Sequence, residues 1–348
     1  MWDNLLLALS RFSDVSTFFD HLMKFLVTGG SGFIGTNLIH FLLREYPNSR
    51  ILNLDIVPPR DTSQNQFFGY CDVTNSISVE TAFHQFSPTH VFHLAATTGI
   101  GNLPLEYFNA NISGVQNVIN ASASCGSLRK IIFASSLLVC RVGYIPESFS
   151  EYCPTTNYGV SKMKGELLVR NSPDHLPWVI VRPISIWGPW NREPYTQFFN
   201  SVLSGFYFHI GKHASWRSLG YVENTVFQLS NLVTADPSLT VRKTFYLADY
   251  GPSSLREMAS KIARYRKHVS PIPVFPLFLV KLIARAGDLL CLVGWNKFPL
   301  TSFRLHNLVT EYVFDLSDLR SVCGSCPFDL ELGISRTIAW LRGKRYLG

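Results

Sequence analysis

The sequence lacks several features that would place the chain outside the ordinary globular proteins. It has no low-complexity tract and no internal repeat, which excludes solenoid and fibrous architectures. Its start has no basic segment ahead of an apolar run, which excludes a secretory signal peptide. The longest apolar stretch, 271–295, is interrupted by charges, which argues against a membrane span. We therefore expect a cytoplasmic protein.

The cysteines do not form a recognisable framework. There are 7, an odd number at irregular spacing, so the disulfide pattern of a small secreted domain is not expected. Cys323 and Cys326 are close, but a zinc or redox site would need a second pair or a strand–helix context. We predict unpaired thiols and no metal site.

Charge is sparse and positive: 16% of residues are charged and the net charge is +7. The lysines and arginines are scattered, and the densest cluster, 264–268, is short. A nucleic-acid partner is therefore not expected. The charge still suits an anionic small substrate or an anionic membrane surface.

Within the stretch 271–295, Lys281, Arg285 and Asp288 follow the spacing i, i+4, i+7 and share one face of a helix. The pattern predicts an amphipathic helix. We favour packing against the helix's own domain over additional contact with a membrane surface or a partner chain.

From residue 24 onward, apolar strands alternate with helical patterns. Strands are predicted at 24–28, 50–55, 66–73, 90–96, 129–136 and 177–183, and helices at 33–46, 76–86, 104–125 and 156–171. Strands that are apolar throughout and alternate with helices predict an α/β fold with a doubly wound parallel sheet. We expect an N-terminal extension (1–22), a Rossmann-type domain (23–182) and a smaller, mainly substrate-binding domain (183–348). The strand at 243–249 is a candidate to rejoin the main sheet.

The glycine-rich turn "VTGGSGFIG" (27–35) joins the first strand to the first helix. The spacing of Gly29, Gly32 and Gly35 permits a tight turn, close approach of a pyrophosphate and close helix packing. Asp55 ends the next strand 20 residues later, where a carboxylate accepts hydrogen bonds from the adenosine ribose. This combination predicts dinucleotide binding and favours NAD over NADP, although Arg60 lies nearby.

Candidate catalytic residues follow. Tyr158 and Lys162 are four apart on a predicted helix and project from one face. A neighbouring cation, together with a positive nicotinamide ring, is expected to lower the Tyr158 pKa and suit it to proton transfer. Ser136, at the end of a strand, is placed to hydrogen-bond a substrate oxygen.

These patterns do not stand alone. The motifs are TGGSGFIG (28–35), LD (54–55), DV (72–73), HLAA (93–96), NISGVQN (111–117), ASS (134–136), PTTNYGVSK (154–162), VRPISIWGP (181–189) and WRSLGYVEN (216–224). Together they resemble the extended short-chain dehydrogenase/reductase superfamily, of the NAD-dependent epimerase/dehydratase type that acts on nucleotide sugars. The resemblance runs from about residue 23 to the C-terminus.

The resemblance implies roles for individual residues. The implied catalytic residues are Ser136, Tyr158 and Lys162. The implied cofactor-binding residues are Gly29, Gly32, Phe33, Ile34, Gly35, Asp55, Asp72, Val73, Leu94, Ala95, Ala96, Asn111, Tyr158, Lys162, Pro183 and Ile186. The implied substrate-binding residues are Ser136, Ser185, Arg217 and Arg304, with Arg217 at the position of the family's arginine for the substrate diphosphate. Ser185 replaces an asparagine that galactose epimerases often carry. A homodimer through helices at 104–124 and 156–171 is also implied.

The residues after Ser136 bear on the reaction. The family's 4,6-dehydratases carry an Asp-Glu pair there, and this chain has Leu137 and Leu138, which disfavours dehydration. An NAD-dependent 4-epimerase of a nucleotide-linked hexose is the favoured interpretation. An NAD(P)H-dependent keto-sugar reductase, a hydroxysteroid-type dehydrogenase and a non-catalytic NAD-binding regulatory module are the alternatives.

Overall fold

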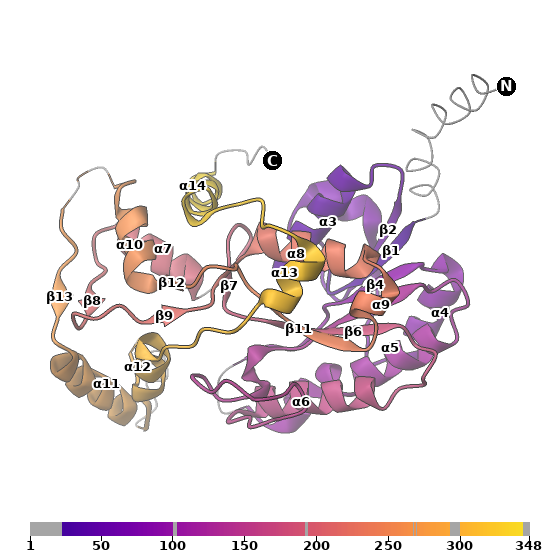
Figure 1. Ribbon diagram of the computed structural model, residues 1–348, viewed down its shortest axis with the longest axis horizontal. Helices are drawn as coiled ribbons and strands as arrows, with labels where there is room; N and C mark the ends of the chain where they lie inside the picture. The colour runs from indigo at the N-terminus through magenta and orange to yellow at the C-terminus, as the bar shows by residue number, and fades with distance from the viewer. Residues whose placement is uncertain are drawn as a thin grey trace, which may run out of the picture.

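The computed structural model describes residues 23–99, 103–191, 194–266, 268, 270–292 and 300–343. The expected N-terminal extension and the last residues of the stretch 271–295 lie outside these ranges. The described chain forms two lobes, a large one built on a single sheet and a smaller one beside it (Figure 1).

The large lobe is built on a seven-stranded sheet in which each strand pairs in parallel with its neighbours. The strands, in spatial order, are β11 (Lys243–Leu247), β6 (Trp178–Pro183), β5 (Lys130–Ala134), β4 (His90–His93), β1 (Lys24–Thr28), β2 (Arg50–Asp55) and β3 (Phe68–Tyr70). The strand order reverses between β1 and β4, and ligands of such sheets bind outside the carboxyl ends of the strands at this point. The predicted doubly wound sheet is confirmed.

The strands are apolar throughout because both faces of the sheet are covered. Neighbouring residues of one strand point into different cores, one on each face of the sheet. In β4, Val91 packs into one core and Phe92 into the other. In β6, Ile180 packs into the core that holds Val91, and Val179 and Val181 pack into the core that holds Phe92. This alternation follows from the two-residue period of a strand.

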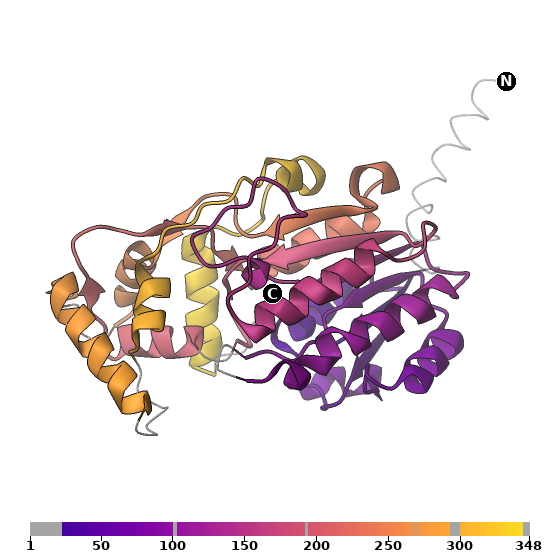
Figure 2. The same ribbon diagram turned by 90° about the horizontal axis from the view of Figure 1, so that it is seen from below.

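Helices cover both faces of the sheet. One face carries α3 (Phe33–Glu45), α8 (Val222–Thr234) and α13 (Ser317–Cys323). The other carries α4 (Ser76–Phe86), α5 (Ser113–Ala123) and α6 (Asn157–Arg170), which lie side by side in Figure 2. Helices α8 and α13 and strand β11 come from the C-terminal half of the chain. That half is therefore shared between the two lobes.

The helix predicted at 104–125 is divided in the structure. A 3₁₀ segment, η3 (Leu105–Asn111), precedes α5, and Phe108 has non-helical dihedral angles. Asn111 accounts for the break, because its side chain donates to Ser161 Oγ at 2.9 Å and exchanges hydrogen bonds with the backbone of Thr97. These contacts hold Asn111 against α6 and the end of β4.

The smaller lobe has its own core, which includes Trp187, Phe199, Tyr221 and Ile338. Its helices are α7 (Tyr195–Leu203), α10 (Leu255–Ala263), α11 (Leu277–Leu292), α12 (Ser302–Val309) and α14 (Leu330–Leu341). Short paired strands link them: β7 (Ile186–Trp187) with β10 (Gly220–Tyr221), β9 (Trp216–Arg217) with β12 (Ser253–Ser254), and β8 (His209–Ile210) with β13 (Val274–Phe275). The remaining elements are η2 (Thr62–Phe67), η4 (Leu137–Val139) and α9 (Pro237–Thr240).

Helix α11 departs from the expected packing on its own domain. Val280, Ala284 and Gly287 are buried, but six large apolar side chains are exposed: Phe278, Leu279, Leu282, Ile283, Leu289 and Leu292. Only one side of the helix therefore contributes to the lobe. None of the helices in the described ranges combines the length and the apolar character needed to cross a bilayer.

The substitution Gly29→Ala tests the turn after β1. Gly29 has φ +74°, and a Cβ there would lie 2.5 Å from the Ala95 nitrogen. We expect a loss of about 2–3 kcal/mol of unfolding free energy, measured by urea denaturation, and weaker NAD binding. Gly126→Ala is the control, since a Cβ at Gly126 meets nothing within 4 Å. Equal effects of the two substitutions would contradict this account of the turn.

Candidate active site

The glycine turn leaves the start of α3 open towards the carboxyl ends of the strands. The Gly29 nitrogen donates to the Leu54 carbonyl oxygen at 2.8 Å, and this bond anchors the turn to β2. A Cβ at Gly35 would lie 2.5 Å from the Gly30 Cα, so the helix packs directly on the turn. Among the described residues, no side chain caps α3 and no acidic residue lies in its first turn. The residues present fit the pyrophosphate of a dinucleotide.

Asp55 closes the turn from the side of β2. Its carboxylate accepts from the Ser31 nitrogen at 3.1 Å and from the Val57 nitrogen at 3.2 Å. Burial raises the Asp55 pKa, and these backbone N–H groups and the charge of Arg60 oppose the rise. Arg60 donates to the Trp190 carbonyl oxygen at 2.6 Å. The carboxylate thus lies beside the glycine turn, as the ribose of NAD requires.

The loops after β3 and β4 complete this side of the site. Asp72 accepts from the Thr74 nitrogen at 2.9 Å, and Val73 is buried against Gly114. The Leu94 nitrogen donates to the Thr28 carbonyl oxygen at 3.0 Å, which brings the segment Leu94–Ala96 beside the glycine turn. His93, just before it, is buried and its pKa is lowered to about 3 by burial and by Lys162, so it stays neutral.

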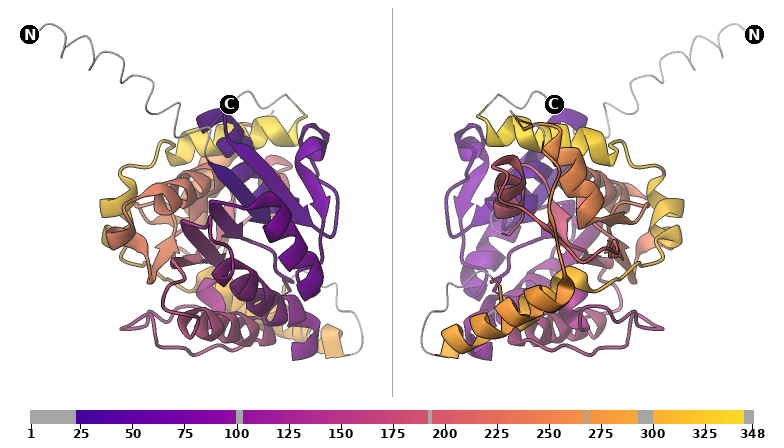
Figure 3. Two further views of the ribbon diagram at one scale, coloured as in Figure 1. Left: turned by 90° about the vertical axis from the view of Figure 1, so that its right-hand side faces the viewer. Right: turned by 90° about the vertical axis from the view of Figure 1, so that its left-hand side faces the viewer.

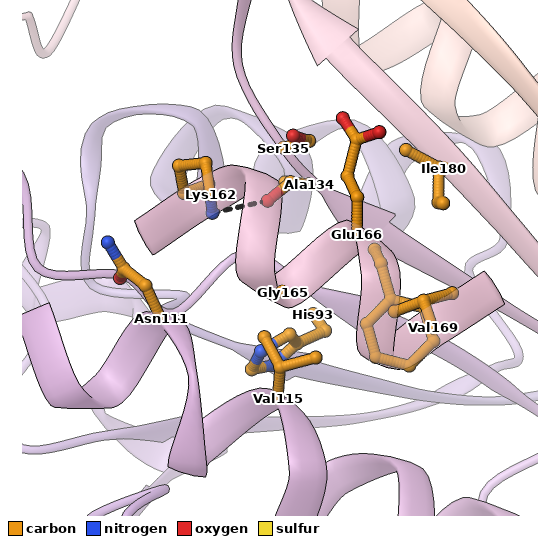
Figure 4. A pocket seen from close by; sticks show the side chains of 11 residues that line it. His93, Asn111, Val115, Ala134, Ser135, Lys162, Gly165, Glu166, Val169 and Ile180 are labelled. Atoms are coloured by element: carbon orange, nitrogen blue, oxygen red, sulfur yellow. Dashed lines mark hydrogen bonds between the residues drawn. The ribbon is translucent and has the colours of Figure 1, made fainter. Parts of the chain in front are cut away.

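The structure brings the three predicted catalytic residues together. Tyr158 is half-buried, and its hydroxyl lies close enough to Ser136 for the Ser136 hydroxyl to lower the Tyr158 pKa. Ser136 Oγ also accepts from the Leu138 nitrogen at 3.1 Å, which fixes the hydroxyl at the start of η4. Lys162 Nζ donates to the Ala134 carbonyl oxygen at 2.6 Å, so the helix bearing Tyr158 is held against the end of β5 (Figure 4).

The Tyr158 pKa differs in direction from the expectation. It is raised by burial, and the nearby Ser136 hydroxyl lowers it only in part. Burial also lowers the Lys162 pKa to about 8, although the charge of Glu166 opposes this. The protein's own groups therefore keep Tyr158 protonated near neutral pH. Removal of its proton requires further positive charge close to the ring.

A buried ion pair beneath Lys162 was not anticipated from the sequence. Glu166, one turn after Lys162, accepts from Arg182 Nε and Nη2, each at 2.8 Å, and from the Tyr152 hydroxyl at 3.0 Å. Burial raises the Glu166 pKa, but the hydrogen bonds and charge of Arg182 outweigh it and lower the pKa. The four-residue spacing of Tyr158, Lys162 and Glu166 along one helix face was the available signal.

The predicted substrate-binding residues lie in different surroundings. Ser185 follows β6, which ends at Pro183, and precedes β7, which starts at Ile186; its φ is +42°. The Ser185 hydroxyl lies 2.9 Å from the Tyr312 hydroxyl. Arg217 is buried, and its Nη1 and Nη2 donate to carbonyl oxygens at the end of α12: Asn307 at 3.1 Å, Leu308 at 2.7 Å and Thr310 at 3.2 Å. Arg304 is exposed on α12.

The family is decided by a comparison with family models. The model of the NAD dependent epimerase/dehydratase family matches residues 25–238. The chain belongs to this family. It is an NAD-dependent enzyme of the extended short-chain dehydrogenase/reductase type, which confirms the resemblance and sets aside the non-catalytic alternative.

Relatives of this family member cover almost its whole length. The N-acetyl-alpha-D-glucosaminyl-diphospho-ditrans,octacis-undecaprenol 4-epimerase of Escherichia coli O157:H7 is 23% identical, over 90% of this chain and 94% of that protein. The decarboxylating sterol-4-alpha-carboxylate 3-dehydrogenase of Schizosaccharomyces pombe is 26% identical, over 92% and 98%. The crystal structure of UDP-glucuronic acid 4-epimerase from Bacillus cereus in complex with NAD has a TM-score of 0.69 at 18% identity, over 92% and 99%.

The substitution Glu166→Gln tests the buried pair. Removing one partner leaves the Arg182 charge buried alone, so we expect a loss of about 3–5 kcal/mol of unfolding free energy at pH 7. Because the pair depresses the Glu166 pKa, its contribution is complete above the ordinary value of 4.5 and is lost as pH falls below it. Urea denaturation at several pH values measures both effects. Glu331→Gln, at an exposed ion pair with Lys261, is the control and should change stability little. If the stability lost in Glu166→Gln stays the same as the pH falls below 4.5, the stabilising role assigned to the ionised Glu166 is contradicted.

Proposed function

We propose that the protein is an NAD-dependent 4-epimerase of a hexose carried on a nucleoside diphosphate. One observation carries the proposal: the Tyr158 hydroxyl lies beside Ser136, on a helix face shared with Lys162, at the carboxyl ends of the strands. Leu137 and Leu138 follow Ser136, so the acid and base that elimination of water requires are missing at this point.

The chemistry divides between cofactor and protein. NAD, when bound, accepts a hydride from the sugar carbon and returns it. Tyr158 Oη takes the proton of the C4 hydroxyl as the hydride leaves, and gives it back when the hydride returns to the other face of the ketone. Ser136 Oγ donates a hydrogen bond to the same sugar oxygen, on which charge develops. Lys162 adds positive charge near the phenolate and holds α6 at the end of β5.

The remaining assignments belong to the same proposal. NAD is held by the glycine turn, Asp55, Asp72, Val73, the segment Leu94–Ala96, Pro183 and Ile186. Asn111 fixes the loop after β4. Ser185 contacts the sugar and Arg217 the diphosphate; Arg217 Nε is buried with no hydrogen-bond partner among the described residues. Arg304 is a second candidate for the diphosphate. We also propose a homodimer through η3–α5 and α6, and a cytoplasmic location.

The names of the relatives support a diphosphate-linked sugar. The Escherichia coli relative is named for a sugar on a polyprenyl diphosphate. A structure of UDP-glucose 4-epimerase with UDP-glucose from Thermotoga maritima has a TM-score of 0.70 at 18% identity.

A second candidate is a 3-hydroxysteroid-type dehydrogenase. The Schizosaccharomyces pombe sterol dehydrogenase is similar over nearly all of both chains. The exposed apolar side of α11 also suits a lipophilic substrate.

Incubation with UDP-, dTDP- and GDP-hexoses and with a 3β-hydroxysteroid separates these reactions. The 4-epimerase is expected to convert a nucleotide sugar to its C4 epimer with no net NADH, detected by chromatography and by absorbance. Oxidation of the steroid with one NADH per turnover would replace the proposal with the second candidate. Turnover of a keto-sugar that consumes NAD(P)H would replace it with a ketoreductase.

The substitution Tyr158→Phe tests the proton transfer. Loss of the hydroxyl should lower turnover by about 10²–10⁴-fold with NAD affinity nearly unchanged, because proton transfer is lost and the ring remains. Tyr70→Phe, at a tyrosine that is 73% exposed, is the control and should keep full activity. Unchanged turnover in Tyr158→Phe would exclude the mechanism.

A further inference from the structure

Helix α11 presents a second apolar face that nothing in the described chain covers. Val280, Ala284 and Gly287, at i, i+4 and i+7, face the lobe. Phe278, Leu279, Leu282, Ile283 and Leu289 lie on a continuous arc of the opposite side, which we call the α11 face. Leu289 is 66% exposed and Phe278 65%. A surface helix normally turns its polar side outward, so this arrangement is reversed.

The neighbouring elements also carry exposed apolar side chains. Val274 and Phe275 of β13, directly before α11, are exposed, as are Phe303 and Leu308 of α12, which packs beside α11. These elements form the end of the smaller lobe farthest from the main sheet, and α11, in orange, runs across that end in the right-hand view of Figure 3. Within the described ranges, no element lies beyond α11 at this end of the lobe.

The charges around the α11 face are positive. Lys281 and Arg285 are exposed along one edge of the arc, and Arg304 is exposed on α12. Asp288 is the one acidic residue within 274–292 and 301–310. Its carboxylate accepts from the Ser302 nitrogen at 3.0 Å, which directs it at the start of α12.

We propose that the α11 face docks on an anionic phospholipid membrane, with α11 lying in the plane of the interface. A helix with an apolar side bordered by lysine and arginine has the properties of an interfacial helix, and the basic edge complements anionic headgroups. A second copy of the chain fits less well, because it would bring the same positive charges to the contact. Docking does not depend on the reaction proposed above.

The docked helix is connected to the substrate-binding lobe. Arg217 donates to the carbonyl oxygens at the end of α12, and Ser215 Oγ donates to the Val309 carbonyl oxygen at 2.8 Å. The position of α11 and α12 is thus fixed relative to Arg217. Membrane docking would hold the substrate-binding lobe against the lipid surface.

Flotation of the full chain with vesicles tests the proposal. We expect the protein to float with phosphatidylglycerol–phosphatidylcholine vesicles and much less with pure phosphatidylcholine. Leu282→Glu with Leu289→Glu should lower the bound fraction at least about tenfold. Lys281→Gln with Arg285→Gln should weaken binding to anionic vesicles roughly tenfold and reduce its salt dependence.

Ile77→Glu is the matched control, since Ile77 is an apolar residue of α4, on the large lobe, and is 74% exposed. It should bind vesicles as the unaltered chain does, and all variants should unfold at unaltered urea midpoints. Vesicle binding that survives both double substitutions would overturn the proposal. The proposal would also be overturned if the unaltered chain does not bind anionic vesicles but forms a dimer, measured by light scattering, and if Leu282→Glu with Leu289→Glu dissociates that dimer.

Discussion

The pairing of Glu166 with Arg182 is the constraint on which the active site depends. Both side chains are buried, and a buried charge is tolerated only where a partner neutralises it. Arg182 lies on β6 and Glu166 on α6, so the pair fixes the helix against the sheet in one register. Lys162 adds a second attachment, to the end of β5. Tyr158, two turns before Glu166 on the same face, is thereby brought to Ser136 without a loop that could move independently.

The two halves of the site are held by different physical means. The cofactor side is shaped by the backbone, through the Gly29 conformation, the uncapped start of α3 and the N–H groups that bond Asp55. On the catalytic side burial dominates, raising the pKa of Tyr158 and lowering that of Lys162. In the proposed mechanism, proton abstraction by Tyr158 therefore depends on a cation in the cofactor site, because burial raises the pKa of the phenol. Such coupling ties the chemistry of Tyr158 to the oxidised cofactor.

Much of this arrangement could be predicted from the sequence, because the decisive signals were local. Continuous apolar residues predicted the strands, and the glycine spacing predicted the turn. The four-residue spacing of Tyr158 and Lys162 indicated one face of α6. Contacts between distant segments could not be predicted. The break before α5 comes from Asn111 bonding Thr97 and Ser161, and the partner of Glu166 lies 16 residues away on another element. Periodicity showed that α11 is amphipathic, but both of its apolar sides satisfied the pattern, and only the fold distinguished the buried side from the exposed one.

In the proposed 4-epimerase, the cofactor is used and regenerated in place. The most direct measurement is the absorbance and mass of whatever the purified protein releases on denaturation. We predict close to one NAD or NADH per chain, retained through purification because the cofactor never has to leave. Protein that is empty, and that binds added NAD(P)H only weakly, would show that the cofactor is a co-substrate and would contradict recycling in the site.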